Sequence, residues 1–150
     1  MKNNLSDLAS VQQVCKRLDK LTQGHKNLWG RMNPTEMLLH CNLCNTQLLE
    51  AHYDVKKPTA KQYIMKLLGL YLKPHFPKNR KGATRNDTAG TVLAIDFDEQ
   101  LCRCKAILNR IHWHRKPITL PHPVFGSLTN KEWGRAAWKH MDHHLRQFGV

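Results

Sequence analysis

The chain has 150 residues, enough for one domain, residues 1–150, with a hydrophobic core. Its formal net charge is +13, and its longest uninterrupted apolar run, around Gly69 at residues 67–72, is far too short to span a membrane. The first residues lack the apolar region of a signal peptide, and five cysteines is an odd number. These features disfavour a disulfide-stapled secreted protein and predict a cytoplasmic one with reduced thiols.

The first expected helix follows Ser6, a suitable N-cap residue. Apolar residues then recur at steps of three and four, and Gly24 is expected to end the helix. The stripe comprises Leu8, Val11, Cys15, Leu18 and Leu21.

Three signals open a second helix: Asn33 as the cap, Pro34 at the first helical position and Glu36 completing a capping box. His40 lies beside the apolar stripe of this helix, which comprises Met37, Cys41, Cys44 and Leu48. The Cys-x-x-Cys spacing is compatible with half of a zinc site or with a redox pair. The second cysteine pair has the wrong spacing for zinc, and no βαβ context accompanies the motif, so we interpret both thiols as core residues.

Residues 54–95 form a long connection. A basic amphipathic helix is predicted from Thr59 to Leu72, followed by a flexible basic loop at 78–87 and an extended segment at 91–95. From Val55 to Arg85 there are nine Lys and Arg residues and no acidic residue. Such a stretch can attract nucleic acid, anionic lipid or an acidic small molecule. No RNA-binding signature accompanies it, so a solvated insertion is the simpler interpretation, with nucleic-acid binding through Lys56–Arg85 as the alternative.

A further helix is expected after the capping pattern that starts at Asp96, and it should end near Trp113. His112 and His114 are interpreted as surface residues. The proline-rich stretch at 117–128 is expected to close one end of a helical bundle.

The last helix is delimited by Thr129 and Glu132, which form a capping box, and by Gly149. Its core-facing stripe comprises Trp133, Ala137, His140, His144 and Phe148. Histidines four residues apart have Cβ atoms about 5–6 Å apart, so both rings can reach one metal ion. A solvated polar face is the alternative interpretation of this pair. His40 on the second helix is the candidate third ligand.

Two stretches of the chain resemble a known family. His-Pro-Val-Phe-Gly-Ser-Leu-Thr at 122–129, with the Glu-Trp-Gly and Lys-His-Met-Asp-His-His-Leu-Arg-Gln-Phe-Gly segments that follow, is similar to the C-terminal signature of an uncharacterised-domain family within the DinB/YfiT-like superfamily of metal-dependent enzymes. Trp-Gly-Arg-Met-Asn-Pro-Thr-Glu-Met-Leu-Leu-His at 29–40 resembles the start of helix two in the same family. The resemblance covers residues 28–149, with the insertion at 55–90 least constrained.

The resemblance implies an all-α fold, an up-down-down-up four-helix bundle with a long basic crossover between helices two and three. It also implies a three-histidine metal site made by His40, His140 and His144. Relatives in the superfamily include S-transferases and isomerases that use low-molecular-weight thiols, and members often form homodimers.

Three neutral imidazoles leave a divalent ion with an open position, which is the arrangement of catalytic rather than structural sites. We therefore expect a metal-dependent enzyme that activates a thiol or water, with chemistry of the thiol S-transferase or hydrolase kind on a small molecule. Zinc or nickel are the favoured ions, and the ligand set is also compatible with iron or manganese.

No catalytic residue is identified from the sequence. His143 and Gln147 are the candidates for groups that contact the ligands, although a surface role is favoured for Gln147. Two other functions remain open, a non-catalytic, stress-associated metal-binding bundle and a basic nucleic-acid-binding module.

Overall fold

The computed structural model describes residues 3–54, 57–79, 86–91 and 96–150. This part of the chain is helical and contains no β-strand, only an isolated bridge between His122 and Gly126. The elements are α1 (Leu8–Leu18), α2 (Pro34–Glu50), α3 (Ala60–Lys66), the π-helix η1 (Leu67–Leu72), α4 (Phe97–Trp113) and α5 (Asn130–Gln147). An all-α fold is therefore confirmed. None of the helices described is long and apolar enough to cross a membrane.

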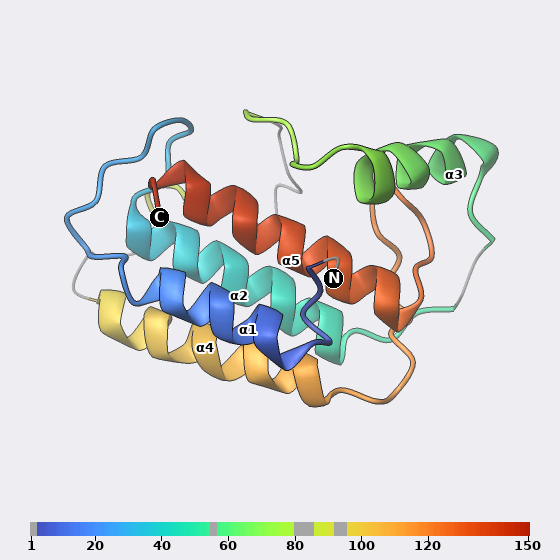
Figure 1. Cartoon of the computed structure of the whole chain (residues 1–150), viewed down its shortest axis with the longest axis horizontal. Helices are drawn as coiled ribbons and strands as arrows, with labels where there is room; N and C mark the ends of the chain where they lie inside the picture. Colours follow the sequence, from blue (N-terminus) through green and yellow to red (C-terminus); the bar gives the residue numbers. More distant parts are fainter. Residues whose placement is uncertain (1–2, 55–56, 80–85, 92–95) are drawn as a thin grey trace.

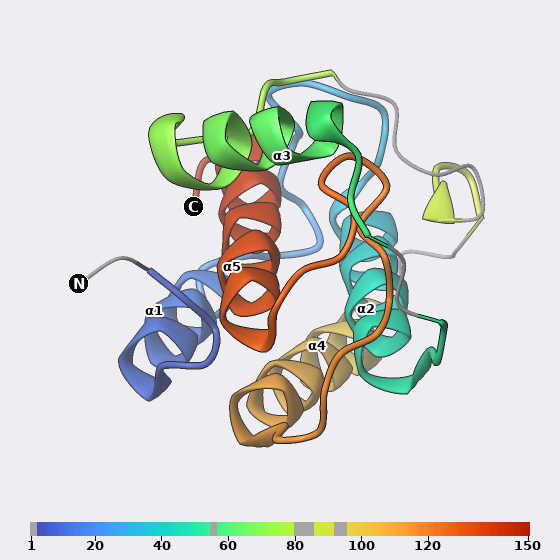
Figure 2. The ribbon, with the colours of Figure 1, turned by 90° about the vertical axis from the view of Figure 1, so that its right-hand side faces the viewer.

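The four long helices α1, α2, α4 and α5 lie side by side along the long axis of the molecule (Figure 1). Helix α2 packs against α4 and α5, and α1 packs against the same two helices. Helices α3 and η1 run across α5 instead of joining this group (Figure 2), and η1 contacts α5 directly. Fully buried side chains fill the space between the long helices, among them Val14, Leu38, Leu108, Met141 and Leu145.

The starts of two long helices follow the predicted capping patterns. Asn33 accepts a hydrogen bond from the Glu36 amide, and the Glu36 carboxylate accepts one from the Asn33 amide. Thr129 and Glu132 form the same reciprocal pair at the start of α5, and Gly149 has the positive φ of 75° expected just after the helix. These local signals therefore place α2 and α5, the two helices that carry the candidate ligands.

Two predicted boundaries are wrong. Helix α1 is capped by Asp7, whose carboxylate accepts the Ser10 amide, whereas Ser6 lies in the preceding turn, where its amide donates to Oδ1 of Asn4. The helix ends at Leu18 and not at Gly24, since the chain continues in turns that still bury Leu21. At α4 the expected helix forms, but the Asp96 side chain makes no capping hydrogen bond.

The crossover helix forms as predicted, with Thr59 as its cap. It is held on α5 by the ammonium group of Lys139, which is only 4% exposed and donates to the carbonyl oxygens of Gly69 and Lys73. Gly69 is needed there, because a Cβ at this position would lie 2.7 Å from the Phe125 ring. The predicted extended segment lies outside the described residues from 92 onward.

Candidate metal centre

Three histidines from two helices meet at one atom, Nε2 of His140. His40 comes from α2, and His140 and His144 lie one turn apart on α5. The Nε2 atom of His140 is 3.1 Å from Nε2 of His40 and 3.2 Å from Nε2 of His144. The rings of His40 and His144 are also close, with centroids 4.8 Å apart. The structure therefore brings together the three residues that the sequence put forward.

The Nδ1 atom of His40 is fixed by a carbonyl. It lies 2.6 Å from the backbone oxygen of Asn86, which can only accept a hydrogen bond, so Nδ1 carries the proton. Burial lowers the pKa of His40, and the Asn86 carbonyl opposes that shift in part. A neutral ring protonated on Nδ1 presents a bare electron pair on Nε2, which is the form that binds a metal.

Gln147 fixes the ring of His144 in the same way. Its Nε2 group donates to the carbonyl oxygen of Trp29 at 2.7 Å, which leaves Oε1 facing Nδ1 of His144 at 2.9 Å. Nδ1 of His144 must then carry the proton, and Nε2 of the same ring is unprotonated, with a free electron pair. Burial lowers the pKa of His144 to about 3, so the ring is neutral. Gln147 is 2% exposed, so the predicted surface role for it is wrong.

At the centre of the cluster there are more unprotonated ring nitrogens than protons to pair with them. His40 and His144 each direct an unprotonated Nε2 at the same atom, Nε2 of His140. Burial and the neighbouring histidines lower the pKa of His140 far below its usual range, so this ring is neutral as well. If its proton is on Nε2, it can satisfy one neighbour only; if not, three electron pairs face one another. A cation at this point satisfies all three at once.

The spacing of the nitrogens also suits a metal ion. Ligands at about 2.0–2.1 Å from a tetrahedral zinc ion are about 3.3–3.4 Å apart. The two measured nitrogen separations, 3.1 and 3.2 Å, are close to this value. The separations of His40 and His144 from His140 therefore suit a divalent ion of the zinc or nickel type, and imidazole also suits iron.

Cys44 lies next to the histidines, where the sequence predicted only a core residue. Its Sγ atom is 3.8 Å from Nε2 of His40, and ligand atoms of His40, Cys44 and His140 all lie within 4.8 Å of one another. Cys41 has the same relation to His140 and His144 but is fully buried, and burial raises the pKa of its thiol well above the usual range. The spacing of four between His40 and Cys44 was the signal available in the sequence.

Asn86 was also missed, because its sequence neighbours suggested a flexible basic loop. Its side chain is 7% exposed, accepts a hydrogen bond from Gln47 at 2.8 Å and donates to Cys44 Sγ at 3.2 Å. The following residues are anchored to α2 as well, since Thr88 donates to the Glu36 carbonyl oxygen and the Gly90 amide donates to the Glu36 carboxylate. Residues 86–91 of the crossover are therefore fastened to α2, and Asn86 borders the site.

His143 lies beside the cluster and not in it. Its ring is 5.1 Å from that of His144 and 5.7 Å from that of Trp29, and it bonds the backbone of Phe76. Burial is the main cause of its lowered pKa. Asp142 belongs to the other side of α5, where it pairs with Arg17 at 2.8 Å.

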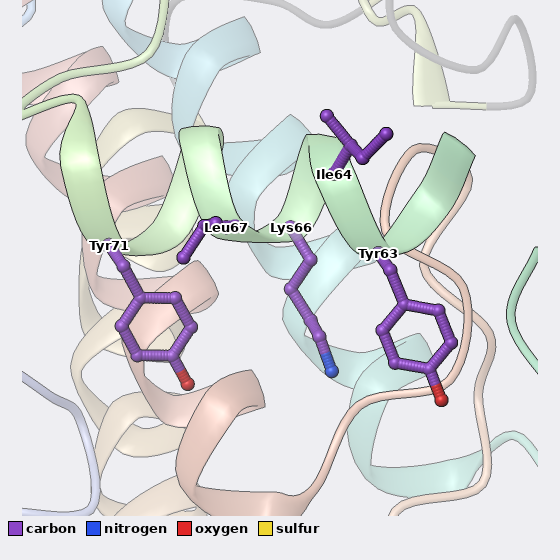
Figure 3. A pocket seen from close by; sticks show the side chains of 5 residues that line it. All are labelled: Tyr63, Ile64, Lys66, Leu67 and Tyr71. Carbon is purple, nitrogen blue, oxygen red and sulfur yellow. The ribbon is translucent and has the colours of Figure 1, made fainter. Parts of the chain in front are cut away.

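The basic crossover has partners of its own where it is described. Lys66 forms an ion pair with Glu132 at 2.9 Å, and the Lys78 ammonium lies 4.3 Å from the centroid of the Trp29 ring. Lys56, Arg80, Lys81 and Arg85 lie outside the described residues. A shallow hollow on α3 and η1 is lined by Tyr63, Ile64, Lys66, Leu67 and Tyr71 (Figure 3). Its lining contains none of the clustered histidines, so this hollow is separate from the candidate metal centre.

The chain matches the model of the family described as "Protein of unknown function (DUF1569)" over residues 2–149. Comparison with curated proteins and with solved structures gave no significant match.

Proposed function

Because the chain belongs to the DUF1569 family, whose function is not known, we propose a function from the site itself: a metal-dependent enzyme that holds a divalent ion through His40, His140 and His144. The observation that carries this proposal is the meeting of three Nε2 atoms, of which those of His40 and His144 are unprotonated because Nδ1 carries the proton of each ring. A buried set of electron pairs with too few protons is unfavourable unless a cation occupies it.

The role of the protein is to hold the imidazoles in the form that binds metal. The carbonyl oxygen of Asn86 and Oε1 of Gln147 accept hydrogen bonds from the Nδ1–H groups of His40 and His144, and this kind of outer hydrogen bond fixes both the tautomer and the direction of a ligand. Three protein imidazoles leave room for a further ligand, and the bound ion would act as a Lewis acid toward water or a small-molecule thiol. Zinc or nickel are our expected ions, with iron or manganese as further possibilities.

The proposed reaction class is based on the open coordination position of the ion and on the resemblance of the sequence to DinB/YfiT-like proteins. We infer thiol S-transferase or hydrolytic chemistry on a small molecule, with a low-molecular-weight thiol as the expected substrate or co-substrate, in a protein that acts as a homodimer. We also infer the up-down-down-up bundle of that superfamily. The colours in Figure 1 support it, because α1 and α5 run from right to left and α2 and α4 run from left to right.

The test is the metal content of purified, untagged protein, measured by plasma mass spectrometry for the wild type, His40→Ala and His140→Ala. We expect about one ion per chain in the wild type and loss of the ion in both variants. His52→Ala, at an exposed residue after α2, is the control and should keep the metal. A wild type without metal after reconstitution, or full occupancy in both ligand variants, would contradict the proposal.

Metal content separates the proposal from one of its two alternatives. A nucleic-acid-binding module that uses the basic residues of 55–85 should bind nucleic acid equally well in His140→Ala, with an affinity that falls steeply with salt. A non-catalytic metal-binding bundle would give the same metal content as an enzyme. It is distinguished by whether the loaded protein turns over thiol-transfer or hydrolysis substrates.

A further inference from the structure

We propose that Cys44 is a fourth protein ligand of the same ion, so that the resting site is closed by three imidazoles and one thiolate. This inference rests on the proposed function, because it needs the ion that the three histidines are proposed to hold. It assigns a chemical role to a residue that the sequence pattern placed in the core.

The backbone arrangement favours four ligands. His40 and Cys44 are one turn apart on α2, and His140 and His144 are one turn apart on α5. Two such pairs on facing helices are a common way to surround a small ion. The Sγ atom of Cys44 is 3.8 Å from Nε2 of His40. A nitrogen at about 2.0–2.1 Å and a sulfur at about 2.3 Å from a tetrahedral zinc ion are about 3.6 Å apart, so the pair needs to move very little.

The surroundings of the sulfur suit a thiolate. The side-chain amide of Asn86 donates to Cys44 Sγ at 3.2 Å, and its orientation is set by Gln47, which donates to the other end of the amide. An N–H group directed at a sulfur stabilises negative charge on it. The carbonyl oxygen of the same Asn86 holds Nδ1 of His40. One residue of the crossover therefore orients two neighbouring ligands.

Cys41 is the competing thiol, and its contacts indicate a different role. Its side chain is fully buried, and its S–H group donates to the sulfur of Met37 at 3.7 Å. This bond requires a protonated thiol in apolar surroundings, as expected for a core cysteine. Cys41 therefore serves as the matched control for Cys44.

A protein thiolate in this position would compete with a thiol substrate. Both are soft sulfur ligands, and the three histidines leave one further position for either. An external thiol would have to displace Cys44, which takes up the proton that the incoming thiol loses. Removal of the Cys44 sulfur should therefore make the ion more accessible to small thiols.

Cobalt(II) is the probe for the test, since a thiolate bound to cobalt gives an intense near-ultraviolet charge-transfer band that imidazole and oxygen ligands do not give. Full-length, reduced wild-type protein is titrated with cobalt(II) beside Cys44→Ser and Cys41→Ser, and circular dichroism verifies that each variant is folded. We expect the band in the wild type and in Cys41→Ser and its loss in Cys44→Ser. The dissociation constant of zinc should rise at least about tenfold in Cys44→Ser.

A rescue experiment sharpens the result. Adding mercaptoethanol to cobalt-loaded Cys44→Ser should restore the charge-transfer band, because the added thiol takes the vacated position. A wild type that binds cobalt through the histidines without a sulfur band would overturn the role of Cys44 and leave the proposed function standing. A band that is lost in Cys41→Ser and kept in Cys44→Ser would assign the sulfur to Cys41 instead. No cobalt binding at all would overturn both proposals.

Discussion

The protein buries histidines in two different settings, one around His122 and one between α2 and α5. The Nδ1 atom of His122 accepts hydrogen bonds from the backbone amides of Val124 and Phe125, at 3.1 and 3.2 Å, and its ring stacks on Phe125 with centroids 4.2 Å apart. At the α2–α5 contact, the Nε2 atoms of His40 and His144 both face Nε2 of His140, and Nε2 of His40 also lies 3.8 Å from Cys44 Sγ.

Burial alone does not distinguish the two settings. It lowers the pKa of His122 to about 4 and that of His144 to about 3, so both rings are neutral. The difference lies in where the electron pairs point. At His122 two N–H donors satisfy the unprotonated nitrogen, whereas in the cluster the unprotonated nitrogens point at one another. A buried histidine is therefore a candidate ligand when its bare nitrogen faces other acceptors.

The largest expected difference between the two histidine settings is the effect of metal on the free energy of unfolding. At a free zinc concentration about 1,000 times the dissociation constant, the free energy of unfolding should rise by about 4 kcal/mol. His140→Ala should lose this increment, and His122→Asn should keep it. Urea denaturation followed by circular dichroism, in zinc and in chelator, measures both. An equal increment in wild type and His140→Ala would place the bound ion elsewhere.

The next prediction concerns the dependence of stability on pH that His122 contributes. Its pKa is about 4 in the folded protein and about 6.5 in the unfolded chain, so the unfolded state binds more protons between these values. The neutral His122 ring makes its full contribution to the free energy of unfolding above pH 6.5. This contribution, about 3 kcal/mol in total, is lost as the pH falls toward 4. His122→Asn retains an acceptor for the Val124 amide without titrating. In chelator, the stability of this variant should fall less than that of the wild type between pH 6.5 and 4. Parallel curves would contradict this account.

A third prediction concerns the acceptor that orients His144. Gln147→Leu leaves Nδ1 of His144 without its partner, so zinc affinity should fall about 10- to 100-fold, or about 1.4–2.7 kcal/mol. Competition with a chromophoric chelator measures the change. Gln13→Leu makes the same substitution at an exposed position of α1 and should leave the affinity unchanged. Equal affinities in the two variants would show that Gln147 does not position the ligand.

The smallest expected effect is that of Gly30→Ala. A Cβ on Gly30 would lie 2.6 Å from Nε2 of Gln147, and the φ of +79° at Gly30 is itself unfavourable for alanine by about 1–2 kcal/mol. Gly90→Ala carries the same φ without a close neighbour, and Gly24→Ala has neither problem. All three are compared by urea denaturation and zinc titration. Zinc affinity should fall several-fold more in Gly30→Ala than in Gly90→Ala. Similar losses in these two would assign the effect to backbone strain alone.

The sequence predicted those features that depend on neighbours along one helix. The capping boxes at Asn33 and Thr129 are local, and so is the stripe that directs His140 and His144 toward one side of α5. These signals were sufficient to anticipate an all-α fold and to select three histidines. They failed at Ser6, because Ser6 lies in a turn in which its amide donates to Oδ1 of Asn4, and Asp7, one residue later, provides the cap.

The features that the sequence could not predict are contacts between segments that lie far apart in the chain. The residues around Asn86 carry the composition of a basic loop, and nothing local indicates that its carbonyl oxygen meets His40, 46 positions earlier. The position of Cys44 relative to His140 likewise depends on how α2 and α5 pack. Gln147 looked like a surface residue because the segment that covers it, around Trp29, lies 118 positions away.

Because residues 86–91 are attached to α2, we expect their attachment and metal binding at His40 to depend on each other. Asn86 holds His40, while Thr88 and Gly90 are fastened to Glu36 at the start of the same helix. We expect an ion bound through His40 to be coupled to this attachment, so that each stabilises the other by the same free energy. Hydrogen exchange at the Gly90 amide, which is far along the chain from every proposed ligand, should slow when metal is bound. The exchange rate of the Gly90 amide would thus report whether the metal site is occupied.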